Sequence, residues 1–185
     1  MKKVVVNMKK VVSIVGSPAI TSRTSILTRY VEKALREAGV DVETIYVRDL
    51  PPEDLLHVNF QSEPLKRTHS MVAAADGVIV ASPVYKASYT GILKTYLDLL
   101  PQDGLRNKAV LPLMSGGTFG HLLAIDYGMK PVLNSLGARH ILGGVYALDT
   151  QLEWQDKDAG TFRIAEEIKL RLDKATKDLM TAMKG

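Results

Sequence analysis

Five hydroxyl-bearing residues follow one glycine near the N-terminus, in the stretch VVSIVGSPAITSRTSIL. The apolar run before the glycine predicts a buried strand, and the residues after it predict a helix. Backbone N–H groups at a helix N-terminus can bind an anion, and hydroxyls add donors without adding charge. The pattern favours a site for a terminal phosphate monoester, formed by Ser17, Thr21, Ser22, Thr24 and Ser25. The alternative is that Ser22 only caps the helix and the other hydroxyls belong to the turn.

Two later segments also have an unusual composition, SPVYKASYTG (82–91) and SGGTFGH (115–121). The first is a rigid, mostly apolar loop that can lie against a flat heteroaromatic ring. The alternative for it is an ordinary turn with a solvent-facing tyrosine. The second contains Gly116 and Gly117, which permit close approach to the backbone, although paired glycines are common in turns.

Other kinds of chemistry are not expected. The loop GSPAITSRTS at 16–25, the glycine loop, has neither Gly-x-Gly-x-x-Gly nor Gly-Lys-Ser/Thr. It therefore matches neither the dinucleotide fingerprint nor the loop that binds nucleoside triphosphates. The sequence has no cysteine, and its four histidines are scattered without the spacing of metal ligands. We therefore expect no metal site and no thiolate nucleophile.

Strand and helix patterns alternate along the chain. Short apolar runs predict strands at 11–15, 42–47, 77–83, 109–115 and 140–148, and helical periodicity predicts helices at 23–38, 65–75, 90–100, 121–136 and 159–183. This alternation predicts a flavodoxin-like α/β three-layer sandwich with a five-stranded parallel sheet in the order 2-1-3-4-5. Pro112 within a strand indicates an edge or a bulge, and 149–160 is expected to be a mobile loop. In such a sheet the three unusual loops meet at the carboxyl ends of the strands.

The overall composition is that of a soluble globular protein. The 185 residues include 46% hydrophobic and 24% charged residues, with a formal net charge of +4. Lysine and arginine are dispersed, so no nucleic-acid partner is expected, and no apolar run is long enough for a membrane span. The absence of cysteine fits a cytoplasmic protein. Because MKKVVVN nearly duplicates the following MKKVVSI, we expect residues 1–7 to be an extension outside a single domain at 8–185.

The three loops, in this order, resemble those of the NADPH-dependent FMN reductase family. The family's Gly-Ser-x-Arg-x-x-Ser-x-Asn is matched by the segment 16–24, although Ala19 replaces the arginine and Thr24 the asparagine. The family's Pro-x-Tyr and Gly-x-Leu-Lys-x-x-x-Asp are matched in PVYKASYTGILKTYLD (83–98). PPEDLLHVNFQSEPLK (51–66) and GGTFGHLLAIDYGMKPVLNSLGA (116–138) are similar to the flavin reductases of two-component alkanesulfonate monooxygenase systems, and the resemblance spans about 8–149.

The resemblance implies an enzyme that uses NADPH or NADH to reduce FMN and supplies the reduced flavin to a separate monooxygenase. Hydride transfer between the two cofactors requires no protein acid or base, so no catalytic side chain is expected. The residues implied to hold the FMN phosphate are Ser17, Ser22, Arg23, Thr24 and Ser25. Those implied to border the flavin ring are Pro83, Val84, Tyr85, Lys86, Gly116, Gly117 and Thr118.

The segment around Tyr127 gives a separate indication. Pro131 has no N–H with which to bond the carbonyl of Tyr127, and this weakened helical ladder favours a π-bulge. In the reductases that this chain resembles, a tyrosine at this place lies in a π-helix at a tetramer interface and is implied to let FMN exchange. We therefore expect a homo-tetramer or dimer with Tyr127 at the interface. The alternative is a proline-kinked helix with a surface tyrosine.

Two other functions share this fold. A reductase with tightly bound FMN, acting on quinones, azo compounds or metal oxyanions, is the main alternative. A non-enzymatic flavodoxin electron carrier is a weaker one, because such carriers are strongly acidic and this chain is basic. The choice between NADPH and NADH is open at this point.

Overall fold

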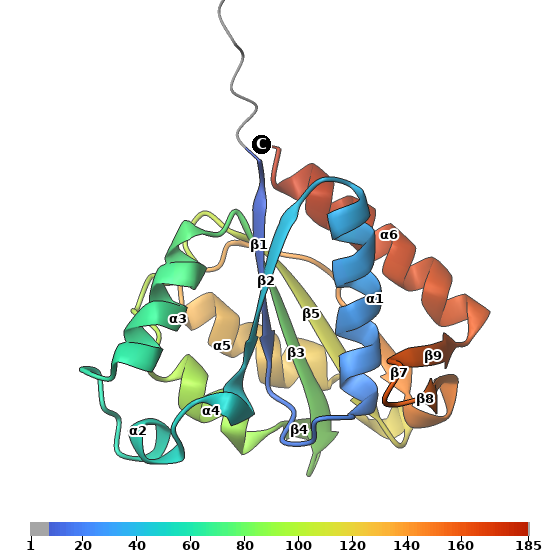
Figure 1. Ribbon diagram of the computed structural model, residues 1–185, viewed down its shortest axis with the longest axis horizontal. Coiled ribbons are helices and arrows are strands. Elements are labelled where there is room, and N and C mark those ends of the chain that lie inside the picture. The colour runs from blue at the N-terminus through green and yellow to red at the C-terminus, as the bar shows by residue number, and fades with distance from the viewer. Residues whose placement is uncertain (1–7, 185) are drawn as a thin grey trace, which may run out of the picture.

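The alternating strands and helices form three layers in the computed structural model, which describes residues 8–184 (Figure 1). The extension expected at residues 1–7 lies outside the described residues. The strands are β1 (Lys10–Val15), β2 (Asp41–Tyr46), β3 (Gly77–Tyr85), β4 (Ser88–Tyr89), β5 (Ala109–Gly116), β6 (His140–Ile141), β7 (Val145–Leu148), β8 (Leu152–Asp156) and β9 (Thr161–Ile164). The helices are α1 (Arg23–Glu37), α2 (Pro52–Leu56), α3 (Glu63–Ala74), α4 (Gly91–Leu97), α5 (Lys130–Ser135) and α6 (Glu166–Ala182), with 3₁₀ turns η1 (Val47–Asp49), η2 (Phe119–His121) and η4 (Asp149–Gln151) and a π-helix η3 (Ile125–Met129).

The central sheet has the order β2-β1-β3-β5-β6, and these strands are parallel. The predicted parallel sheet between helices is confirmed, but the prediction of five strands is wrong because the sheet has seven. One additional strand is β4, which pairs antiparallel with the end of β3. The other arises because the strand expected at 140–148 is divided into β6 and β7, both of which pair with β5.

Pro112 explains this division. The N–H of Leu142 donates to the carbonyl of Val110, so the backbone N–H and C=O groups of Val110 face the β6–β7 side of β5. Every second residue of a strand presents these groups to the same side, so the backbone of Pro112 faces β6 and β7 as well. Pro112 has no N–H to offer there, and pairing resumes only between Leu113 and Val145. Gly144, at φ +81°, packs so closely on the carbonyl of Pro112 that a Cβ would lie 2.8 Å from its oxygen. The irregularity expected from Pro112 therefore falls on the neighbouring strand.

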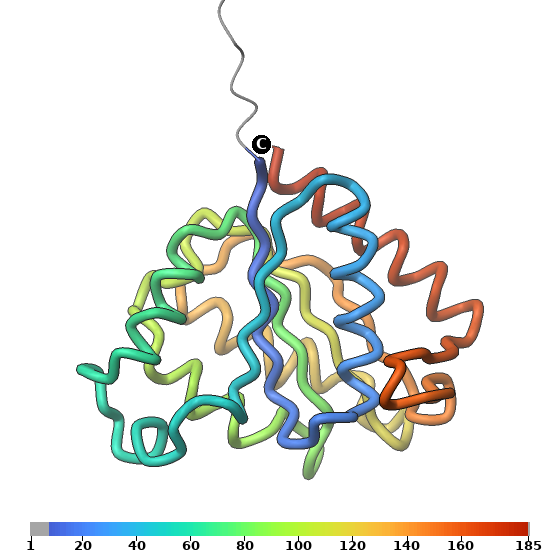
Figure 2. Tube along the Cα trace, viewed as in Figure 1, coloured from blue at the N-terminus to red at the C-terminus, as the bar shows by residue number. Residues whose placement is uncertain are grey.

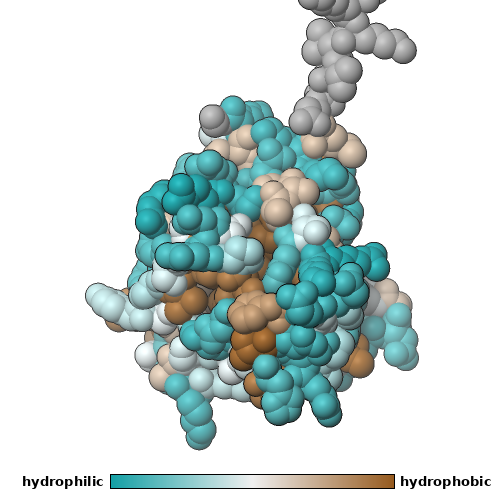
Figure 3. Space-filling model, turned by 90° about the vertical axis from the view of Figure 1, so that its left-hand side faces the viewer, coloured by the Kyte–Doolittle hydropathy of each residue, from teal (hydrophilic) through white to brown (hydrophobic). Residues whose placement is uncertain are grey.

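Two hydrophobic cores cover the two faces of the sheet. Helices α1 and α6 pack on one face, and α3, α4 and α5 pack on the other (Figure 1). In the strands the buried residues alternate between the cores, as with Val11 on the α1 side and Val12 on the α3 side. Figure 3 views the molecule from the α3 side and shows hydrophobic side chains gathered near the centre of that face, with hydrophilic ones around them.

The C-terminal part differs most from expectation. The segment 149–160 is not a plain loop, because it contains η4 and β8, and the last helix begins at Glu166 rather than near 159. β8 pairs antiparallel with β9, which places Trp154 opposite Phe162 and Glu153 opposite Arg163. Figure 2 shows this β8–β9 hairpin beside the start of α1. The region expected to be one helix at 121–136 is likewise broken into η2, η3 and α5.

The predicted π-bulge is confirmed. Residues Ile125–Met129 form the π-helix η3, and the N–H of Lys130 donates to the carbonyl of Ile125, five residues earlier. The side chain of Tyr127 is 79% exposed. Phe119, Leu122 and Leu123 are also exposed.

Candidate active site

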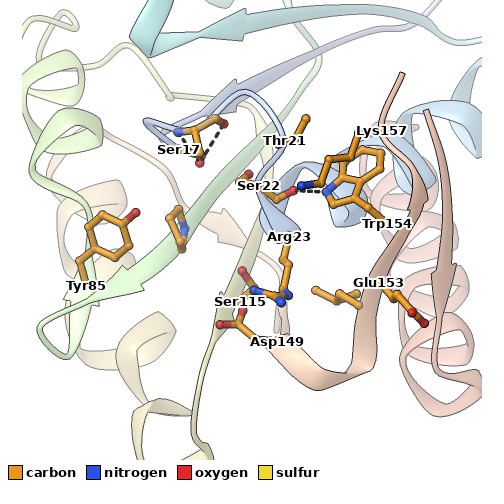
Figure 4. A pocket seen from close by; sticks show the side chains of 13 residues that line it. Ser17, Thr21, Ser22, Arg23, Tyr85, Ser115, Asp149, Glu153, Trp154 and Lys157 are labelled. Atoms are coloured by element: carbon orange, nitrogen blue, oxygen red, sulfur yellow. Dashed lines mark hydrogen bonds between the residues drawn. The ribbon is translucent and has the colours of Figure 1, made fainter. Parts of the chain in front are cut away.

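The three loops of unusual composition meet at the carboxyl edge of the sheet, where they border a cavity of about 430 Å³ (Figure 4). This volume lies within the range of about 300–1,000 Å³ that is usual for small-molecule sites. The lining residues are Ser17, Ala19, Thr21, Ser22, Arg23, Pro83, Tyr85, Ser115, Asp149, Leu152, Glu153, Trp154 and Lys157. A larger hollow of about 620 Å³ lies between β2 and α3 and is lined by none of the three loops. The cavity at the loops is therefore the candidate site.

The glycine loop is shaped by two serines. Ser22 caps α1, since its Oγ accepts a 3.1 Å hydrogen bond from the N–H of Ser25. Ser17 is almost fully buried, and its Oγ accepts from the N–H of Ala19 at 3.3 Å. The first turn of α1 contains no acidic residue, and the helix dipole favours an anion at this end. Ser22 thus caps α1 and also lines the cavity. Ser17, Thr21 and Arg23 line the cavity as well.

Two of the predicted phosphate ligands face the interior. The hydroxyl of Thr24 lies 2.7 Å from that of Ser115, and both residues are buried. The hydroxyl of Ser25 lies 2.9 Å from that of Ser22. Neither Thr24 nor Ser25 lines the cavity. The hydroxyl of Thr24 therefore connects α1 to β5, and the hydroxyl of Ser25 connects to the cap residue Ser22.

The second loop contributes Pro83 and Tyr85 to the lining, but not Val84 or Lys86. Pro83 pairs in register with Ser115 of β5, which brings the second and third loops together. The tip of the β3–β4 hairpin is strained, because Lys86 and Ala87 have φ values of 49° and 66°. Beyond the tip, the hydroxyl of Thr90 donates to the carbonyl of Gly16 and so connects the second loop to the first.

The third loop passes over a buried tyrosine. The hydroxyl of Tyr146 donates a 2.7 Å hydrogen bond to the carbonyl of Thr118. A Cβ on Gly116 would lie 2.4 Å from that hydroxyl oxygen, so only glycine fits there. Burial, together with the charge of Asp149, raises the pKa of the Tyr146 hydroxyl. Gly116, Gly117 and Thr118 stand beside the cavity without lining it, whereas their neighbour Ser115 lines it.

The β8–β9 hairpin forms a wall of the cavity that sequence reasoning missed. The indole N–H of Trp154 donates to the carbonyl of Ser22 at 3.2 Å (Figure 4). The guanidinium of Arg29 lies 5.5 Å from the centre of the Trp154 ring, and Phe162 meets that ring edge-on. Leu152, Glu153 and Lys157 complete this wall. The available signal was the sole tryptophan of the chain, placed in an otherwise polar segment.

The site fits a phosphorylated flavin better than a metal ion. Hydroxyls, the start of α1 and Arg23 stand at one side of the cavity, and Pro83 and Tyr85 offer a mostly apolar surface at the other (Figure 4). In the part of the chain that the structure describes, no three His, Cys, Asp or Glu side chains are grouped to hold a metal ion. Among residues 8–184, no helix has the length and apolarity required to cross a membrane.

Comparisons with known proteins agree with this geometry. Residues 9–153 match the family described as NADPH-dependent FMN reductase. The FMN reductase (NADPH) of Pseudomonas putida KT2440 is 49% identical over 146 residues, which cover 79% of this chain and 74% of that protein. The FMN reductase (NADPH) of Escherichia coli K12 is 50% identical over 145 residues, which cover 77% and 75%.

A solved structure extends the likeness beyond those segments. The apo form of an NADH:FMN oxidoreductase superposes with a TM-score of 0.84 at 36% identity, covering 95% of this chain and 90% of the other. Family match, identity and superposition lead to one conclusion. The chain belongs to the NADPH-dependent FMN reductase family and is an oxidoreductase that uses FMN and NAD(P)H.

Proposed function

We propose that this chain reduces FMN as an exchangeable substrate, with NADPH or NADH as the hydride donor, and supplies the reduced flavin to a separate monooxygenase, with alkanesulfonate oxidation as the favoured setting. The observation that carries the proposal is the cavity bordered by a hydroxyl-rich helix start and by the Pro83–Tyr85 loop. The proposal places the enzyme in the cytoplasm.

The chain's own residues bind and orient rather than react. Ser17, Ser22 and Arg23, with the N–H groups of the first turn of α1, would hold the phosphate. Thr24 and Ser25 would contribute through their backbone, since their hydroxyls are engaged elsewhere. Pro83 and Tyr85 would lie against the ring, with Val84, Lys86 and the Gly116–Thr118 loop shaping its surroundings. When bound, the flavin accepts hydride from the nicotinamide, so no protein acid or base is required.

The π-helix supports an assembly of copies. Tyr127 is exposed, as are Phe119, Leu122 and Leu123 in the same stretch of the chain, and contiguous exposed apolar side chains mark interaction surfaces. We propose that this face packs against another copy of the chain in a homo-tetramer or dimer. Tyr127→Asp should then give a smaller species in sedimentation velocity. Leu170→Asp, which alters an exposed apolar residue on α6, is the matched control and should leave the assembly unchanged.

The proposed activity is tested by purifying the protein without added flavin, recording its visible spectrum and assaying NADPH oxidation with and without FMN. A colourless protein that oxidises NADPH only when FMN is added, and saturably, supports FMN as a substrate. A yellow protein that keeps FMN through dialysis and reduces a quinone or an azo dye without added flavin would overturn it. That result would establish a prosthetic flavin instead.

A further inference from the structure

One guanidinium near the glycine loop has no role in the site described above. Arg48 lies in η1, directly after the edge strand β2, and its side chain is only 13% exposed. Its guanidinium carbon lies 4.3 Å from the centre of the Tyr46 ring, and its Nη1 donates a long hydrogen bond of 3.5 Å to the carbonyl of Ala19. Ala19 lines the cavity. Arg48 is therefore held against the glycine loop from the β2 side.

The guanidinium has few acceptors for its five N–H donors. Its Nε is buried and has no hydrogen-bond partner among the described residues. The carboxylate of Asp49 approaches Nε to 3.4 Å, but that side chain is 63% exposed and faces water. Burial of a cation with so few acceptors is unfavourable unless an anion comes close. An anion seated in the glycine loop would provide this compensation.

The charge pattern of the loop points the same way. The segment 17–22 has no charged side chain, and Arg23 is the cation that directly follows it. The N-terminal end of α1 adds positive potential there, and Lys157 of the β8–β9 hairpin also lines the cavity. A dianionic phosphate monoester is stabilised more by two guanidinium groups than by one.

We propose that Arg48 is a binding residue for the FMN phosphate and that it sets a preference for FMN over riboflavin, which has the same ring but no phosphate. This inference rests on the proposed function. Arg48 would approach the phosphate from the β2 side of the loop while Arg23 approaches from the α1 side. Its stacking on Tyr46 would hold the guanidinium in place and reduce the entropy lost on binding.

The test compares the dissociation constants of FMN and riboflavin for wild type and Arg48→Gln, measured by quenching of flavin fluorescence. We expect FMN to bind about tenfold more weakly, or more, to the variant. Riboflavin binding should change by less than about twofold, since only the phosphate contact is lost. The KM for FMN should rise while kcat at saturating FMN is kept. Inorganic phosphate should compete with FMN more weakly in the variant than in wild type.

Two variants separate binding from structural support. Arg36→Gln is the matched control. Arg36 also donates to a backbone carbonyl, that of Val42 at 3.2 Å, but it lies in the last turn of α1, at the opposite end from the glycine loop. It should leave both flavin constants unchanged. Asp49→Asn removes the competing carboxylate, so it should leave FMN binding unchanged or tighten it. If Arg48 served only an ion pair with Asp49, Asp49→Asn would weaken FMN binding as Arg48→Gln does.

Equal weakening of FMN and riboflavin would overturn the inference, and so would unchanged FMN binding in a folded Arg48→Gln. Should that variant fail to fold, Arg48→Lys replaces it, because lysine keeps the positive charge but cannot stack as a planar group. The FMN affinity of Arg48→Lys should be lower than that of the wild type and higher than that of the double variant Arg23→Gln/Arg48→Lys. These failures differ from failure of the proposed function. A wild type without FMN-dependent NADPH oxidation contradicts the function, whereas an active wild type with an unaltered Arg48→Gln contradicts only this inference.

Discussion

The phenol of Tyr146 reaches across from β7 and donates a 2.7 Å hydrogen bond to the carbonyl of Thr118, directly beneath the third loop of the site. The ring is buried, and Gly116 leaves room for the hydroxyl. One side-chain bond thus connects a core strand to the backbone of a loop that borders the cavity.

Tyr146→Phe removes this bond without leaving a cavity. Loss of one hydrogen bond of this kind costs about 0.5–1.5 kcal/mol, so FMN should bind about two- to tenfold more weakly as the loop loosens. Isothermal calorimetry with FMN measures this. Tyr30→Phe is the control, because Tyr30 makes a similar 2.8 Å bond to Asp173 away from the site and should lower stability alone. Equal FMN affinities in the two variants would contradict the prediction.

The buried hydroxyl pair of Thr24 and Ser115 yields a prediction on stability. Thr24→Val keeps the shape of the side chain but leaves the Ser115 hydroxyl without its partner, which should cost about 1–3 kcal/mol in the free energy of unfolding. The double variant Thr24→Val/Ser115→Ala should recover part of this loss, because neither polar group then remains. Urea unfolding monitored by circular dichroism gives the four values of the cycle. A Thr24→Val protein as stable as the wild type would show that the pair is not coupled.

His69 should make stability depend on pH. Burial lowers its pKa below the ordinary 6.5, and its Nε2 has no hydrogen-bond partner in the described part of the chain. As pH falls below 6.5, the unfolded chain takes up the proton before the folded chain does, so the free energy of unfolding decreases. When the pH is lowered from about 7.5 to about 5.5, the melting temperature of His69→Gln should therefore fall by less than that of the wild type. His140→Gln, at an exposed position, should follow the wild type.

The strained tip of the β3–β4 hairpin predicts a stabilising substitution. Ala87 has a φ of 66°, a conformation that costs residues other than glycine about 1–2 kcal/mol. Ala87→Gly should therefore raise the melting temperature by about 2–4 °C. Differential scanning calorimetry measures this. Ala38→Gly is the control, because Ala38 has a φ of −85° and glycine there should only add unfolded-state entropy. A fall in melting temperature for Ala87→Gly would contradict the strain argument.

Local patterns predicted the parts of the fold that depend on local forces. The apolar run at 11–15 and the amphipathic repeat from Arg23 correspond to β1 and α1 with small changes of boundary. The π-helix also followed from local chemistry, because Pro131 cannot complete the helical ladder. The division of the strand at 140–148 did not, since it depends on Pro112 in a neighbouring strand about thirty residues earlier.

The lining of the candidate cavity could be anticipated in part for the same reason. Ser17, Ser22 and Arg23 follow β1, whereas Pro83 and Tyr85 belong to the last residues of β3, and all five line the cavity. The inward direction of Thr24 is set by its buried contact with Ser115, which hydroxyl spacing alone does not reveal. The hairpin wall was missed because a short polar segment such as 149–160 predicts a loop unless its partner strand is known.

The bond from Trp154 to Ser22 has an optical consequence. The chain contains one tryptophan, and its indole N–H is attached to the residue that caps α1 at the rim of the cavity. All indole emission therefore originates next to the glycine loop, where a change in polarity or in that hydrogen bond shifts its wavelength and intensity. The protein carries a built-in fluorescent reporter of whatever occupies that loop, with no label to attach and no second tryptophan to obscure it.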